Sequence, residues 1–234
     1  MKKILLIYFL SFNAISELTL EITQGTEDPY RVAIIKFSGA DKAATDIQKV
    51  VFDNLLRTGE FTIFDDEDLL SIPQIEEDIV FNDFRILDID FLVMGQVKGD
   101  GLNVSVEYQV FDISKAKKIR TSTVYGIPNK DRQLAHYVSD GIYQEITGIP
   151  GIASTKILYV TEANNFKLLI SDADGNNEQV LLESPEPIIS PSWSPDSKKV
   201  AYVSFETGIA KVYIQDIASG KRDVAIENSS QISS

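Results

Sequence analysis

Two segments of the chain repeat their hydrophobic residues at the spacing of an α-helix. In residues 41–58 the repeating positions are Ala44, Ile47, Val51 and Leu55. In residues 129–147 they are Leu134, Val138, Ile142 and Ile146. A glycine follows each segment, at Gly59 and Gly148, and glycine commonly ends a helix. The pattern therefore predicts two helices, each with one apolar face directed at a core.

Short runs of alternating or continuous apolar residues surround these helices and predict β-strands. They lie at residues 17–25, 31–37, 61–64, 90–97, 102–113 and 118–125. The sequence Gly99-Asp100-Gly101 between two of these runs is typical of a hairpin turn. Residues 65–88 are acidic and interrupted by Pro73, with a helical turn expected near Asn82–Leu87. The first part of the chain is thus predicted to be an α/β (α+β) domain.

The helical spacing disappears after Ile149-Pro150-Gly151, which reads as a linker. Short strands follow, and they repeat: KILYVT from Lys156 matches KVAYVS from Lys199 at an offset of 43 residues. Repeats of 40–45 residues with several short strands are typical of β-propeller blades. Ser194-Pro195-Asp196-Ser197 has the composition of a tight turn between two strands. We expect Trp193, the only tryptophan, to pack between sheets.

The first residues have the layout of a secretory signal peptide. Lys2 and Lys3 precede the apolar run Ile4–Phe12, and small residues follow at Ala14 and Ser16. The apolar run is too short to span a membrane as a helix. We therefore expect a signal peptide over residues 1–16, an α/β domain over 17–149 and a partial propeller over 155–234, in an exported protein.

Composition excludes several classes of function. The net charge of −13 disfavours nucleic acid as a partner, because the phosphates would be repelled. The chain contains no cysteine and one histidine, so thiol chemistry and the usual catalytic triads lack their residues. We expect His136 to be partly buried and structural, and we predict no catalytic residue, no metal site and no cofactor.

Two acidic features have plain structural interpretations. The runs Asp65–Asp68 and Glu76–Asp78 could attract a basic protein, but a solvated surface is the simpler interpretation. Asp172-Ala-Asp174-Gly175 begins like a calcium-binding loop, yet its glycine is at position four where such a loop needs it at position six. We interpret the second feature as a hairpin turn.

The chain resembles the TolB family of the bacterial Tol–Pal system along almost its whole length. The resemblance rests on these segments: Glu21–Gly25 (EITQG), Ile146–Gly148 (ITG), Lys156–Val160 (KILYV) and Ser190–Ser204 (SPSWSPDSKKVAYVS). One departure is Ser197, where the family's repeat usually has glycine. The resemblance implies an N-terminal α/β domain followed by a WD-like β-propeller of about six blades, which is incomplete here.

The resemblance also implies a function without catalysis. It implies a periplasmic scaffold that supports outer-membrane integrity, envelope constriction at cell division and protein import. Its implied partners are the C-terminal domain of TolA, and Pal, a lipoprotein that binds the propeller. The TolA-binding segment carried over to this chain is Glu17, Leu18, Thr19, Leu20, Glu21, Ile22 and Thr23. An extended segment of this kind can add a strand to an exposed sheet edge.

Alternatives remain from the residues themselves. Residues 17–23 could instead form an edge strand or docked arm of their own domain. Propeller repeats also occur before serine peptidase domains and in ligand-binding, lectin-like propellers. Because most of a propeller is missing, we expect either a fragment of a longer protein or a truncated gene, and in both cases Pal binding is doubtful.

Overall fold

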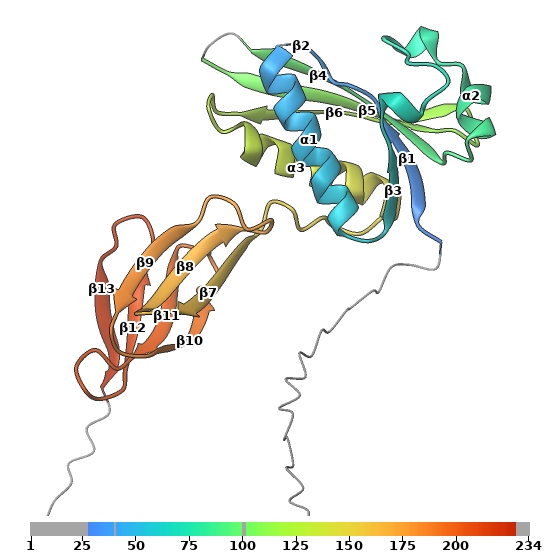
Figure 1. Ribbon diagram of the computed structural model, residues 1–234. Coiled ribbons are helices and arrows are strands. Elements are labelled where there is room, and N and C mark those ends of the chain that lie inside the picture. Colours follow the sequence, from blue (N-terminus) through green and yellow to red (C-terminus); the bar gives the residue numbers. More distant parts are fainter. Residues whose placement is uncertain (1–27, 40, 100–101, 228–234) are drawn as a thin grey trace, which may run out of the picture.

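The computed structural model describes residues 28–39, 41–99 and 102–227. Its first half is built on one sheet (Figure 1). The strands are β1 (Tyr30–Ile34), β2 (Ser38–Gly39), β3 (Phe61–Phe64), β4 (Phe91–Gly99), β5 (Val104–Asp112) and β6 (Lys117–Gly126). The strand order is β3-β1-β4-β5-β6, with β2 paired to β4. Strands β3, β1 and β4 run parallel, whereas β4, β5 and β6 form an antiparallel meander.

Two helices cover one face of this sheet, α1 (Asp41–Arg57) and α3 (Asp131–Thr147) (Figure 1). The residues that the sequence spacing places on the apolar faces are buried, and they pack against strand residues such as Val93 and Val106. Gly59 and Gly148 both have positive φ angles, +73° and +77°, which a side chain would disfavour. The two predicted helices and their glycine ends are therefore confirmed.

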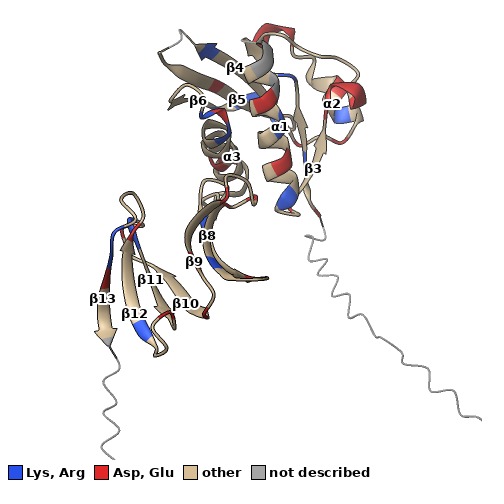
Figure 2. Cartoon of the chain, turned by 60° about the vertical axis from the view of Figure 1, so that its left-hand side comes forward, with Lys and Arg blue, Asp and Glu red and all other residues tan. Residues whose placement is uncertain are grey.

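The opposite face of the sheet is covered by the acidic segment. It contains α2 (Phe81–Ile86) and the short 3₁₀ helices η1 (Asp66–Asp68) and η2 (Glu76–Asp78). Phe84 of α2 is buried against Leu92 and Phe111 of the sheet. The acidic side chains of η1 and η2 are mostly exposed, and Figure 2 shows red segments near α2. This distribution agrees with a solvated acidic surface over an apolar underside.

The second half of the chain forms two further sheets. One holds β7 (Lys156–Glu162), β8 (Phe166–Asp172) and β9 (Gln179–Ser184); the other holds β10 (Ile188–Trp193), β11 (Lys199–Ser204), β12 (Lys211–Asp216) and β13 (Arg222–Glu227). All neighbouring strands are antiparallel. Leu168 and Ile170 of the first sheet share one core with Val200 and Tyr202 of the second. Trp193 packs against this core, as predicted.

The two sheets follow the sequence repeat. Lys156 begins β7 and Lys199 begins β11, so β7-β8-β9 corresponds to β11-β12-β13. The residues 194–198 join β10 to β11, and Ser197 has a φ of +56°. A left-handed backbone at this position explains why glycine suits it. An α/β domain followed by the sheets of an incomplete propeller is therefore the fold.

Several predictions fall outside the described residues or need small corrections. The signal peptide and the strand expected at residues 17–25 lie outside the described ranges. The strand predicted at residues 31–37 ends earlier, at Ile34, and Ser38–Gly39 pairs separately with β4. Within residues 28–39, 41–99 and 102–227, no helix combines the length and apolar content needed to cross a membrane.

Candidate functional site

The main polar site of the described chain lies where α3 meets the turn after β8. His136 of α3 is at its centre and is only 2% exposed. The sequence predicted that His136 is partly buried. The side chain is more deeply buried than this, because the turn after β8 contributes residues around the imidazole. Because the ring is buried, its polar atoms depend on hydrogen-bonding groups of neighbouring residues.

A chain of hydrogen bonds determines which nitrogen of His136 carries the proton. Asn54 of α1 accepts a hydrogen bond from Arg57 through its Oδ1 (3.2 Å). Its Nδ2 donates to Ser139 Oγ (2.9 Å), and the hydroxyl of Ser139 is committed to the carbonyl of Ala135 (2.8 Å). The same Nδ2 lies 2.8 Å from His136 Nδ1, so Nδ1 must be the acceptor. The proton of the neutral ring is therefore on Nε2.

That Nε2–H group faces two carboxylates from the other half of the molecule. It lies 3.7 Å from Oδ2 of Asp172 and 3.6 Å from Oδ2 of Asp174, just beyond hydrogen-bond length. Burial lowers the pKa of His136, although the negative charges of Asp174 and Asp172 oppose this change. The ring is therefore held neutral near pH 7 by its surroundings.

Both carboxylates have cationic partners of their own. Arg132 of α3 binds Asp174, and Lys156 of β7 binds Oδ1 of Asp172 at 2.5 Å. Burial would raise the pKa values of both acids. Hydrogen bonds from Lys156 and Asn177 outweigh it at Asp172, and hydrogen bonds from the Asn176 N–H and Arg132 outweigh it at Asp174, so both pKa values are lowered. The two acids stay ionised, each neutralised by one cation.

This cluster of one imidazole and two carboxylates has the composition of a metal site but not its electrostatics. Arg132 and Lys156 already balance the two negative charges, and the Oδ2 atoms accept bonds from Arg132 and Asn177. The hydrogen bond from Asn54 also leaves the proton on Nε2, the atom that would have to bind the ion. The arrangement is suited to joining two parts of the chain.

A second set of contacts holds the linker between the two halves. Both carboxylate oxygens of Asp140 accept backbone N–H groups, from Ala153 (2.7 Å) and Ser154 (3.0 Å). Gly151 lies so close to Asp140 that a Cβ atom there would sit 2.4 Å from its Oδ1. The linker is therefore clamped to α3 rather than loosely attached.

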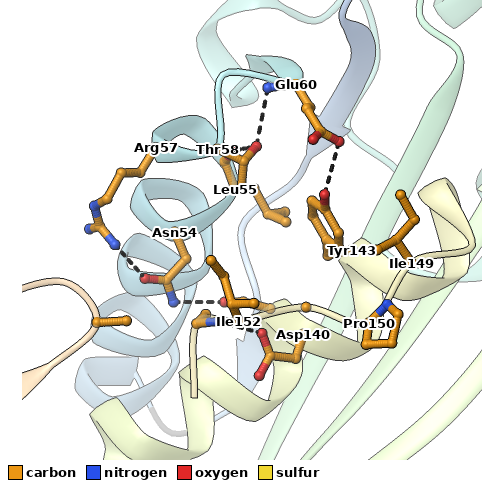
Figure 3. A pocket seen from close by; sticks show the side chains of 14 residues that line it. Asn54, Leu55, Arg57, Thr58, Glu60, Asp140, Tyr143, Ile149, Pro150 and Ile152 are labelled. Carbon is orange, nitrogen blue, oxygen red and sulfur yellow. Dashed lines mark hydrogen bonds between the residues drawn. The ribbon is translucent and has the colours of Figure 1, made fainter. Parts of the chain in front are cut away.

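A cavity of about 330 Å³ lies beside this clamp, between α1, α3 and the linker (Figure 3). Its apolar walls come from Leu55, Tyr143, Ile149, Pro150, Ile152, Ala153 and Ala173. On one side, the Tyr143 hydroxyl donates to Glu60 at 3.0 Å. Burial and this hydrogen bond raise the pKa of Tyr143, which keeps the hydroxyl protonated as a donor. The cavity has the size and lining to accept an apolar group.

Sequence reasoning and structure identify different residues. The predicted TolA-binding residues Glu17–Thr23 lie outside the described ranges. The sequence did not identify Asn54, Arg132, Asp140 and the two acids after β8 as one group. One signal was available: Asp172 has a counterpart at Asp216 in the second repeat, but Asp174 has none. An acid that is present in just one of the two repeats indicates a role specific to that repeat.

Comparison with known proteins supports the resemblance in both halves of the chain. A family model described as the TolB amino-terminal domain matches residues 18–119, and the model of the TolB beta propeller domain matches residues 143–233. The Tol-Pal system protein TolB of Alcanivorax borkumensis is 39% identical over 217 residues, covering 90% of this chain and 50% of that relative. The TolB of Alkalilimnicola ehrlichii is 37% identical, covering 87% and 50%.

A solved structure agrees with these matches. The crystal structure of TolB from Acinetobacter baumannii superposes with a TM-score of 0.78 at 35% identity, covering 87% of this chain and 51% of that one. The chain thus spans about half the length of the relatives that it matches. Over that span, with its amino-terminal domain and the first sheets of its propeller, the chain belongs to the TolB family.

Proposed function

We propose that this chain is a periplasmic, non-catalytic adaptor of the Tol–Pal system that binds the C-terminal domain of TolA through Glu17–Thr23. The observation that carries the proposal is the 39% identity to a Tol-Pal system protein over 90% of the chain. In this proposal, residues 1–16 are removed on export. The α/β domain then extends over residues 17–149 and the propeller part begins at residue 155.

The proposed binding segment has a suitable sequence and place in the chain. Leu18, Leu20 and Ile22 alternate with polar residues, as in a strand with one apolar face. In the sequence, the segment precedes β1 by a few residues. Pairing with an exposed sheet edge would satisfy its backbone groups, and its apolar side would supply specificity.

A role without catalysis agrees with the surroundings of the only histidine. His136 Nδ1 is taken by Asn54, and the neighbouring Ser139 hydroxyl donates to a backbone carbonyl. Neither group is placed to activate a nucleophile. We propose that binding alone links this chain to outer-membrane integrity, envelope constriction at division and protein import.

Binding to Pal is proposed to need more of the propeller than this chain carries. The two sheets expose apolar side chains such as Ile157 and Ile214, which are 46% and 40% exposed. A blade gains much of its stability and shape from its neighbours. We therefore expect this chain to bind TolA but to bind Pal weakly or not at all.

The direct test compares the chain beginning at Glu17 with one beginning at Gln24, using calorimetric titration with purified TolA C-terminal domain. The proposal expects at least about a hundredfold weaker binding for the shorter chain, since most contacts would be lost. Circular dichroism should show unchanged secondary structure. Equal affinity of both chains would refute the assigned segment.

A point substitution in this segment distinguishes strand pairing from an effect of shortening the chain. Leu20→Pro removes a backbone donor and should weaken TolA binding strongly, whereas Leu20→Val keeps the donor and the strand preference. If both variants bind alike, the segment does not act as an added strand. If neither the complete segment nor its variants bind TolA, the proposed function itself fails.

A further inference from the structure

The cavity beside the linker combines apolar walls with a rim of exposed isoleucines (Figure 3). Its volume of about 330 Å³ lies at the lower end of the range found for small-molecule sites. Ile149 is 58% exposed and Ile152 is 70% exposed, although both belong to the lining. Apolar side chains gathered around a hollow in this way are typical of ligand-binding grooves.

Most polar side chains of the cavity wall already have partners within the protein. Thr58 donates to the carbonyl of Leu55 at 2.7 Å, and Arg57 donates to Asn54 at 3.2 Å. Both carboxylate oxygens of Asp140 accept N–H groups from the linker. These groups hold α1, α3 and the linker, so a ligand would have to break existing hydrogen bonds to use them.

The half-buried carboxylate of Glu60 is the exception. Its Oε2 accepts the hydroxyl of Tyr143 at 3.0 Å, while Oε1 accepts no hydrogen bond from the described part of the chain. Within the same residues, no cationic side chain lies at ion-pair distance from Glu60. Tyr143 belongs to the apolar wall, so this unpaired negative charge borders an apolar space. Such a carboxylate attracts a cation and disfavours an anion.

We propose that this cavity binds a small organic amine, with its positively charged nitrogen beside Glu60 and a short apolar body between Leu55 and Ile152. At about 30 Å³ for each non-hydrogen atom, the volume of a liquid water, the cavity holds about ten such atoms. A ligand bound there contacts α1, α3 and the linker together, and by linkage it holds the linker against α3. This inference does not depend on the binding of TolA.

The first test compares three probes that share a phenylethyl body. Phenethylamine is positively charged at about pH 7, phenethyl alcohol is neutral and hydrocinnamate is negative. Each is titrated into the isotope-labelled chain beginning at Glu17, and the backbone N–H signals of Ala153 and Ala173 in NMR spectra report the cavity. We expect the amine to bind about fivefold to tenfold more tightly than the alcohol, and hydrocinnamate not measurably. Equal affinities for the three probes, or no binding of the amine, would overturn the proposal.

Glu60→Gln separates the charge of the cavity from its shape. The amide oxygen can still accept the hydroxyl of Tyr143, but the negative charge is lost. The affinity for the amine should fall to that for the alcohol, and the affinity for the alcohol should stay the same. Glu67→Gln is the matched control, because Glu67 is exposed on η1 and does not line the cavity. If Glu60→Gln binds the amine as tightly as the wild type does, the proposal fails.

Two further variants test the apolar wall and the other occupant of the cavity. Ile152→Ala should weaken the amine and the alcohol by the same factor, about threefold or more, since both lose the same contact. Unchanged binding of both would place the ligand elsewhere and refute the site. A chain beginning at Gln24 should bind the amine as the longer chain does. Binding by the shorter chain alone would show that Glu17–Thr23 fills the cavity, which would also refute the proposal.

Limited proteolysis tests the effect of the ligand on the linker. At about ten times its dissociation constant, phenethylamine should slow cleavage within residues 149–155 about tenfold, because cleavage requires the open linker. Hydrocinnamate at the same concentration should leave the rate unchanged. An amine that binds in the NMR titration but does not slow cleavage would overturn the role of this site in holding the linker.

Discussion

Among the described residues, the sheet of the α/β domain is covered on both faces, whereas the two propeller sheets share their core with each other. In the first half, α1 and α3 close one face and the segment with α2 closes the other. In the second half, the shared core lies between the sheets, and outward residues such as Ile157, Ile214 and Ile226 are 40–63% exposed.

The difference shows how two kinds of architecture distribute stability. A closed domain buries its apolar residues within itself, so each buried residue contributes to one cooperative unit. A blade of a repeating structure buries one face against its neighbour and presents the other to the next. The contacts of His136 and Asp140 join the α/β domain to the propeller sheets.

The largest expected effect comes from the same substitution placed in each half. Ile142→Ala in α3 removes a fully buried side chain from the core and should lower the free energy of unfolding by about 2–5 kcal/mol. Ile226→Ala on β13, where the side chain is 63% exposed, should change it by less than about 0.5 kcal/mol. Urea unfolding followed by circular dichroism measures both. Similar losses would contradict the contrast drawn between the two halves.

An intermediate effect is expected from releasing the linker. Asp140→Ala leaves the N–H groups of Ala153 and Ser154 without their acceptor and should cost about 1–3 kcal/mol. Limited proteolysis should then cut the linker faster, and the halves should unfold less cooperatively. Asp53→Ala, which removes an exposed acid from α1, is the charge-matched control. Equal cleavage of the two variants would mean that Asp140 does not clamp the linker.

The smallest expected effect is a gain in the propeller part. Ser197 adopts a φ of +56°, and Ser197→Gly should relieve the left-handed strain by a few tenths to about 1 kcal/mol. Ser197→Ala keeps a Cβ atom and should give no gain. Thermal unfolding of the three proteins distinguishes these outcomes. A gain from alanine equal to that from glycine would show that backbone strain is not the cause.

Much of the fold was predictable because it depends on local spacing. The helices around Ile47 and Ile142 follow from the helical spacing of their apolar residues. The hairpin between β4 and β5 follows from the glycine-rich sequence between the two strands. The repeat of Lys156 and Lys199 anticipated two related sheets. The early end of β1 at Ile34 was missed, because apolar residues continue beyond it at Ile35 and Phe37.

The candidate site was not predictable in the same way. Asp172 and Asp174 were interpreted as parts of a hairpin turn, and Gly175 does occupy such a turn with a φ of +80°. Nothing in the local sequence indicated that both acids also face α3. His136 was expected to be partly buried and structural, but its near-complete burial depends on residues from both halves of the chain.

Sequence alone determined the helices, the strands and the repeat, because hydrophobic period and turn residues act over a few neighbouring positions. Only the tertiary structure decided the protonation state of His136. Its partner Asn54 is 82 positions away in the sequence, and its facing acids come from another sheet. Electrostatic and hydrogen-bonding energies depend on distance and burial in space, and those quantities exist only once the chain has folded.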